Sequence, residues 1–193
     1  MRLAACSVAL LVAGCATLPE PGGVEDWPAR RSALQSLEHW SLSGRMAVAA
    51  GSEGFSGGLN WLQDGAKAAI ELRGPMGGRA ISIQMDGDAF SVTDGRGETV
   101  DGEDAERLIA SNIGTTLPIA ELRFWLVGVP APGAPHQETV GPDRRLLRLD
   151  QSGWQVTYSS YREAEEIVLP ARMEMTTDGL RLRVVVSEWR LDR

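Results

Sequence analysis

Apolar residues alternate with polar ones through most of this chain, and this period of two constrains the fold more than any other feature. The alternation runs through residues 43–92 and returns through residues 147–191. Turn signals such as Asp64-Gly65 and Asp86-Gly87 interrupt it at short intervals, as is typical of antiparallel hairpins. The pattern predicts a mainly β chain of about ten strands that follow one another in a single curved antiparallel sheet.

Three short segments have helical spacing instead. Residues 29–40 carry apolar side chains at helical intervals, the last of them Trp40. A second helix is expected over residues 104–112. A third begins near Pro118, a favourable first helical position, and ends before Gly128.

The N-terminus has the features of a bacterial export signal. Arg2 precedes an apolar stretch, residues 3–13, that is too short to cross a bilayer and is typical of a secretory signal. Small residues then lead to Cys15, as in the lipobox of bacterial lipoproteins, whose cysteine is acylated after cleavage on its N-terminal side. Ala16 in place of an aspartate is typical of an outer-membrane destination. The alternative is an ordinary signal peptide with a chance cysteine.

These signals divide the chain into three regions. Residues 1–14 are expected to be the lipoprotein signal peptide, and residues 15–28 the lipidated cysteine with a flexible tether rich in proline and glycine. Residues 29–193 have the size of one domain. Within it, residues 130–142 are again rich in proline and glycine and are expected to form a linker.

Composition narrows the range of partners. The formal net charge is −7, and a chain this acidic is expected to have no nucleic-acid partner. Both cysteines, Cys6 and Cys15, lie in the N-terminal segment, so the domain has no disulfide and depends on packing. Six tryptophans against three phenylalanines is an unusual ratio that a fold must explain.

The residues of a catalytic or metal site are missing from the sequence. His39 and His136 have no partner at a meaningful spacing, and no zinc motif or nucleophile elbow occurs. Ser56 stands beside Gly57-Gly58, whose glycines are better explained by strand curvature or close packing than by a reactive serine. We therefore expect a binding protein rather than an enzyme, with neither metal nor cofactor.

A strongly bent sheet with few helices tends to leave an internal cavity, with the helices as its lid. The alternative is a solid core, because strand alternation looks the same in both cases. Methionine and tryptophan suit an adaptable apolar pocket. The candidate lining residues are Trp61, Met85, Trp125, Trp154, Met173, Met175 and Trp189.

Several segments, in this order and behind a lipobox, resemble one family. They are residues 40–48 (WSLSGRMAV), 57–61 (GGLNW), 74–77 (GPMG), 122–130 (LRFWLVGVP), 153–158 (GWQVTY) and 169–173 (LPARM). Together they resemble LolB, the outer-membrane lipoprotein receptor family.

The resemblance implies both a fold and a function. It implies an unclosed antiparallel β-barrel of about eleven strands whose apolar cavity is covered by about three short helices, and so favours a cavity over a solid core. It also implies a receptor that is held in the outer membrane through Cys15, faces the periplasm, accepts lipoproteins from the carrier LolA and takes up their acyl chains. We expect a monomer.

The resemblance also implies a loop that inserts cargo into the membrane. In the family this loop carries an apolar residue at its tip, usually leucine, and the matching residues here are Pro75, Met76 and Gly77. Methionine in place of leucine is a mild departure, since both side chains are long and apolar. Two other classes stay open: a lipoprotein that binds other lipids, and a structural lipoprotein without a cavity.

Overall fold

The computed structural model describes residues 26–51, 53–74, 80–87, 89–113 and 117–191. This part of the chain forms three helices, α1 (Trp27–Gln35), α2 (Gly102–Ile113) and α3 (Ile119–Val127). It also forms eleven strands: β1 (His39–Ala50), β2 (Glu53–Asp64), β3 (Lys67–Arg73), β4 (Ala80–Asp86), β5 (Ala89–Thr93), β6 (Thr99–Asp101), β7 (His136–Val140), β8 (Leu146–Gln151), β9 (Trp154–Ala164), β10 (Ile167–Thr177) and β11 (Leu180–Leu191).

All eleven strands belong to one antiparallel sheet in the order β6-β5-β4-β3-β2-β1-β11-β10-β9-β8-β7. Strands β1 to β6 follow one another across one half, and strands β7 to β11 across the other. The first strand pairs with the last, which joins the two halves. Since β6 and β7 lie at opposite edges of the described sheet, the architecture is the expected unclosed barrel of mainly β structure.

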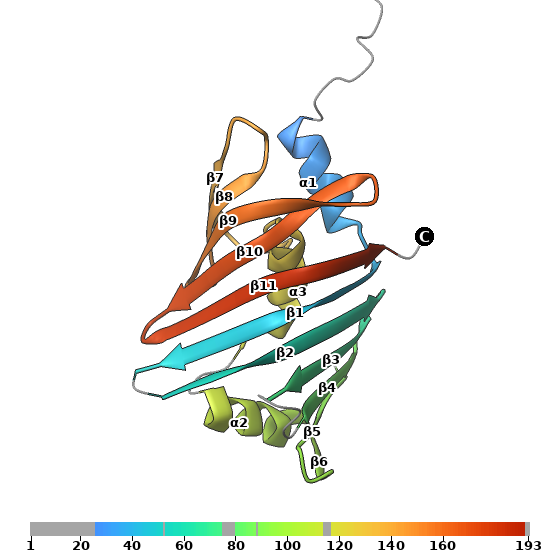
Figure 1. Ribbon diagram of the computed structural model, residues 1–193, viewed down its shortest axis with the longest axis vertical. Helices are drawn as coiled ribbons and strands as arrows, with labels where there is room; N and C mark the ends of the chain where they lie inside the picture. The colour runs from blue at the N-terminus through green and yellow to red at the C-terminus, as the bar shows by residue number, and fades with distance from the viewer. Residues whose placement is uncertain (1–25, 52, 75–79, 88, 114–116, 192–193) are drawn as a thin grey trace, which may run out of the picture.

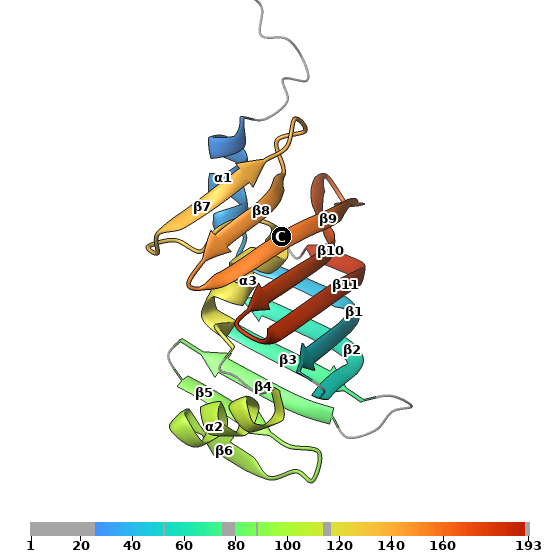
Figure 2. The same cartoon turned by 90° about the vertical axis from the view of Figure 1, so that its left-hand side faces the viewer.

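The sheet curves around one face, and the three helices lie on that face (Figure 1 and Figure 2). Helix α3 crosses behind the middle strands, α2 lies beside β5 and β6, and α1 lies at the other end of the molecule (Figure 1). We call this helix-covered side the concave face. Strand alternation directs the apolar side chains to it, as in β1, where Trp40, Leu42, Met46 and Val48 are buried.

The interval between the buried residues Val186 and Trp189 of β11 departs from a period of two because β11 has a bulge opposite Gly44 of β1. The register with β11 shifts between Ser43 and Gly44. A Cβ at Gly44 would collide with the backbone carbonyl of Val185, so only glycine allows the two strands to approach this closely. The extra residue in β11 brings Trp189 to the concave face, the same face as Val186.

Tryptophan side chains occupy the middle of the core and explain the high content of this residue. The ring of Trp40 stacks on that of Trp61, with centroids 5.9 Å apart, and lies edge-on to that of Trp189 at 5.4 Å. Trp189 donates its indole N–H to the carbonyl oxygen of Pro170 at 2.9 Å. Among the described residues, one core cluster and one sheet extend over residues 34–191, so we expect this part of the chain to fold as a unit.

The expectation of a helix over residues 29–40 was wrong at its C-terminal end. Helix α1 ends at Gln35, and Trp40 lies in β1, where it pairs with Gln63 and Leu191. An apolar residue that ends a helical pattern also begins the alternation of the next strand. Burial favours the strand over the helix for Trp40, because its side chain is only 1% exposed on the concave face.

The expected linker over residues 130–142 contains strand β7, so that expectation was wrong as well. The strand is an edge strand with largely exposed side chains, which leaves no apolar alternation to detect. Helix α1 holds it through Glu138, which accepts hydrogen bonds from the indole of Trp27 at 2.8 Å and from Arg31 at 3.2 Å.

Candidate functional site

The concave face is apolar where α2 and α3 cover it. Three spaces lie between these helices and the sheet. We call them the α2 hollow, the central seam and the flank hollow, and each is defined below by its lining residues.

The α2 hollow has a volume of about 420 Å³ and lies between α2 and strands β1 to β5. Its walls are aliphatic and aromatic, and its polar residues come from the turn after β5. Ligand pockets generally have volumes of about 300–1,000 Å³, so this space has the size of a binding site. Its lining residues are Met46, Phe55, Leu72, Ile81, Ile83, Val92, Asp94, Gly95, Arg96, Leu108 and Ile109.

Asp94 supplies a negative charge at the α2 hollow. Its carboxylate accepts hydrogen bonds from the backbone N–H groups of Arg96 at 2.7 Å and Glu98 at 3.1 Å. The bond from Arg96 is the main reason why the pKa of Asp94 is lower than usual. The group therefore stays ionised at neutral pH.

The central seam lies under α3 and is narrow, with a volume of about 30 Å³. Every residue that lines it is apolar, so the helix and the sheet are close to contact here. Its lining residues are Met46, Leu59, Trp61, Ile70, Leu72, Ile83, Leu117, Ile119, Leu122, Leu126, Met175, Leu182 and Val184.

The flank hollow lies on the other side of α3, next to the turns that follow β2 and β4, and has a volume of about 320 Å³. It contains one charged side chain, that of Arg123. Its lining residues are Trp61, Gln63, Ala66, Ala68, Met85, Gly87, Ile119, Ala120, Arg123 and Phe124.

Shared walls make the three spaces neighbours along one line. Leu72 and Ile83 line both the α2 hollow and the central seam, and Trp61 and Ile119 line both the central seam and the flank hollow. A small outward shift of α3 would therefore open a continuous apolar channel with a mouth at each end.

The C-terminal end of α3 is fixed to the sheet by buried hydrogen bonds. Gln151 of β8 accepts the indole N–H of Trp125 at 2.9 Å, and it also bonds the backbone N–H and carbonyl of Ala131, both at 2.8 Å. Tyr158 donates its hydroxyl to the carbonyl of Trp125 at 2.9 Å. Gly128 caps the helix in the left-handed conformation, as expected from the sequence.

The N-terminal end of α3 and helix α2 are held differently. Ile119 and Leu122 of α3 face the central seam, and Ala105 and Ile109 of α2 are buried against the sheet. Apolar contacts of this kind have no fixed direction, so they restrain the orientation of a helix less strictly than buried hydrogen bonds do. Movement is therefore easier at this end of α3 than at the end that Gln151 holds.

Of the predicted cavity residues, Trp61, Met85 and Met175 line these spaces. The others lie in the core, where the rings of Trp125 and Trp154 lie 6.2 Å apart, and Trp154 also lines an open depression of about 790 Å³ at the turn between β8 and β9. Contact between any of them and an acyl chain stays a prediction. The core residues are Trp125, Trp154, Met173 and Trp189.

Sequence reasoning missed most of the lining of the α2 hollow. Met46, Ile81, Ile83 and Val92 fall within the alternation of residues 43–92, but none of them is among the predicted cavity residues. Bulky rings fill space, whereas the hollow occurs where aliphatic side chains meet a single helix. Cys15, Pro75, Met76 and Gly77 lie outside the described residues, the last three between the ends of β3 and β4.

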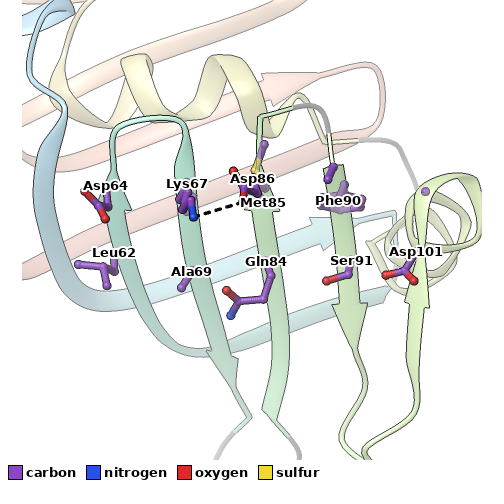
Figure 3. Close-up of a pocket in the computed structure, with 13 residues that line it drawn as sticks. Leu62, Asp64, Lys67, Ala69, Gln84, Met85, Asp86, Phe90, Ser91 and Asp101 are labelled. Carbon is purple, nitrogen blue, oxygen red and sulfur yellow. Dashed lines mark ion pairs between the residues drawn. The ribbon is translucent and has the colours of Figure 1, made fainter.

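The outer face of β2 to β5 carries a shallow depression of about 670 Å³ (Figure 3). Leu62, 49% exposed, lies at one side of it, and the ion pair between Lys67 and Asp86, 3.3 Å apart, lies near the tips of the hairpins. Because it is open and carries charges, it shelters apolar groups less well than the concave face does. None of the helices in the described ranges has the length and apolar character needed to cross a membrane.

Comparison with known proteins agrees with this geometry. A family model described as "Outer membrane lipoprotein LolB" matches residues 38–189. The outer-membrane lipoprotein LolB of Nitrosococcus oceani is 36% identical over 187 residues, which cover 94% of this chain and 93% of the relative. That of Stutzerimonas stutzeri is 35% identical over 193 residues, which cover 97% and 93%.

Two solved structures share the fold at low identity. A DUF1329 family protein from Desulfovibrio piger has a TM-score of 0.60 at 12% identity, over 86% of this chain and 90% of that protein. A LolA superfamily protein from Nitrosomonas europaea has a TM-score of 0.54 at 10% identity, over 84% and 94%. Since the family model extends over both halves of the sheet, the chain belongs to the LolB family of outer-membrane lipoproteins.

Proposed function

We propose that this protein is a receptor that accepts lipoproteins from the periplasmic carrier LolA and inserts them into the outer membrane. The observation that carries the proposal is the apolar line of the α2 hollow, central seam and flank hollow beneath two helices. In this role the concave face shelters acyl chains, and the protein binds cargo without chemical turnover.

The cost of exposing acyl chains to water explains why such a site is needed. Each methylene in water costs about 0.8 kcal/mol, so one long chain costs on the order of 10 kcal/mol. A lipoprotein therefore cannot cross the periplasm unaided. Transfer from carrier to receptor to bilayer needs no nucleotide if each host binds the chains better than the one before it.

Helix α3 is the lid in this proposal. The central seam, at about 30 Å³, is too narrow for an acyl chain as it stands. Entry therefore requires the N-terminal end of α3 to move away from the sheet, while Gln151 and Tyr158 hold the C-terminal end in place. The helix would pivot about its fixed end and close again after release.

Acylation of Cys15 would hold the receptor at the outer membrane, facing the periplasm as a monomer. Its replacement by serine removes the acylation site and should release the protein from the membrane fraction. Residues 26–193 would then be sufficient to accept cargo in solution.

A purified transfer assay tests the proposal. A labelled lipoprotein bound to LolA is mixed with residues 26–193, and the label should move to the receptor. Ile81→Trp, which fills the α2 hollow, should reduce the transfer, whereas Leu62→Trp on the outer face should not. No transfer to the unaltered domain would refute the role, and uptake of free phospholipid alone would favour a general lipid-binding lipoprotein.

A further inference from the structure

Arg123 is the one charged residue among those that line the flank hollow. Its guanidinium carbon lies 4.5 Å from the centre of the Phe124 ring, which holds the group against an apolar surface. One of its N–H groups donates to the carbonyl of Gly65 at a long 3.3 Å. A guanidinium has more donors than this contact uses.

The other walls of the flank hollow offer little to balance this charge. All the residues that line it are described, and none of them is acidic. The amide of Gln63 is already occupied: it accepts the indole N–H of Trp61 at 3.0 Å and donates to the carbonyls of Gly65 and Lys67, each at 3.0 Å.

Two acidic side chains that neighbour this hollow in sequence are paired elsewhere. Asp64 lies 2.8 Å from the ring nitrogen of His39, and Asp86 pairs with Lys67. Both carboxylates line the depression on the outer face, which Figure 3 shows at the hairpin tips. The flank hollow therefore has a cation at its mouth and no competing anion in its walls.

The opposite end of the apolar line carries charges of both signs. Asp94 is ionised at the α2 hollow and lines it together with Arg96, so the arginine there already has a carboxylate beside it. An anion held by an arginine in an apolar setting forms short charge-assisted hydrogen bonds, roughly twice as strong as neutral ones. The two mouths therefore differ, because the flank hollow is lined by an arginine without a carboxylate and the α2 hollow by an arginine with a carboxylate.

We propose that the flank hollow is a head-group site, in which Arg123 binds the anionic oxygen atoms of an acyl amphiphile whose tail points along the central seam toward the α2 hollow. This inference depends on the proposed function, because it requires acyl chains to enter the concave face. It adds a ligand class, acyl chains that end in a carboxylate or phosphate, and an orientation for the bound chain.

Titration calorimetry on residues 26–193 with decanoate and decanol tests the inference, since these ligands share a tail and differ in charge. The unaltered domain should bind decanoate about ten-fold more tightly than decanol. Arg123→Met should remove this preference and leave decanol binding unchanged. The matched control Arg96→Met, at the other mouth, should keep the preference, and Arg123→Lys should keep part of it.

Decyl phosphate forms the third arm and separates the two sources of the anion. Binding tighter than that of decanoate supports a phosphate head group, and weaker binding supports a carboxylate. Equal binding of decanoate and decanol to the unaltered domain would overturn the inference, as would equal losses for both in Arg123→Met. If no ligand binds, the acyl-binding function fails, and the head-group site with it.

Discussion

The concave face is filled differently in two regions. Around the C-terminal end of α3, rings, methionines and a buried amide pack against β8 to β10, and only at the edge of this packing do Gln151 and Trp154 also line an open depression of about 790 Å³. Beneath α2, aliphatic side chains of β3 to β5 leave a hollow of about 420 Å³. We call these the packed region, defined by Trp125, Gln151, Trp154, Val156 and Tyr158, and the hollow region, defined by the lining of the α2 hollow.

The difference in packing indicates that the two regions of the sheet have different roles. In the packed region, close-packed side chains and buried hydrogen bonds together fix a single arrangement of the side chains. The hollow region combines apolar walls with a helix that rests on non-directional contacts. A receptor that must open and close needs both, since a lid moves reproducibly only if one of its ends is fixed.

The largest effect on stability is expected from Gln151→Leu in the packed region. Gln151 is 3% exposed, and its loss leaves the indole N–H of Trp125 and both backbone groups of Ala131 without their bonds. We expect the free energy of unfolding to fall by about 3–6 kcal/mol in urea denaturation. Gln155→Leu, at a half-buried site on the next strand, should cost less than about 1 kcal/mol. Equal losses would contradict the special role of Gln151.

Adding the same ring to each region compares them directly. Val156→Trp inserts a large side chain where Val156 is 0% exposed and should destabilise the protein by about 3 kcal/mol or more. Ile81→Trp inserts it beside the α2 hollow and should cost less than about 1 kcal/mol, because the space already exists. Thermal and urea unfolding measure both. A severe loss in Ile81→Trp would mean that the hollow region is as tightly packed as the other.

Alkaline pH should lower the free energy of unfolding through Tyr158 of the packed region and Tyr161, whose ring centre lies 6.0 Å from that of Tyr158. Burial raises the pKa of Tyr158 well above the ordinary 10.0 and also raises that of Tyr161, whose hydroxyl donates to the carbonyl of Leu146 at 2.7 Å. Below the unfolded-state pKa both phenols are protonated in the folded and the unfolded protein, and their full contribution to the free energy of unfolding is present. As the pH rises above that pKa, the unfolded chain loses protons that the folded protein keeps, so the free energy of unfolding falls. The limiting slope is about 1.4 kcal/mol per pH unit for each phenol.

A double variant provides the control for this pH dependence. Tyr158 and Tyr161 are the two tyrosines of the chain, so Tyr158→Phe with Tyr161→Phe removes every phenol. Urea unfolding of this variant between pH 9 and 11 should show a flatter profile. If the profile is as steep as that of the unaltered protein, other groups cause the alkaline loss.

Much of this fold could be predicted from the sequence, because apolar and polar residues alternate clearly along the strands. The turns also contain residues that are typical of turns, such as Asp64-Gly65 and Asp86-Gly87. Residues that serve two patterns were assigned wrongly, as with Trp40, which ends a helical pattern and begins a strand. The exposed edge strand β7 left no apolar signal. The pairing of β1 with β11 joins the two ends of the domain, and no local pattern reports it.

The site was harder to predict than the fold. Alternation marks Ile83 and Val156 alike as inward, but one lines a hollow and the other fills a core. The volume left between side chains depends on the position of α2 and α3 over the sheet, which is a property of tertiary structure. The large aromatic residues drew attention to the packed region instead.

The smallest effect on stability, and a selective effect on function, is expected from Met76→Glu. Met76 falls between β3 and β4, whose residues Leu72, Ile81 and Ile83 line the α2 hollow, so uptake and release would be served by the same part of the sheet. We expect the free energy of unfolding to change by about 0.5 kcal/mol or less. The variant should accept lipoprotein from LolA but deliver it poorly to liposomes, because a carboxylate at this place opposes entry into the bilayer. Met76→Leu should deliver normally, and normal delivery by Met76→Glu would remove this residue from the release step.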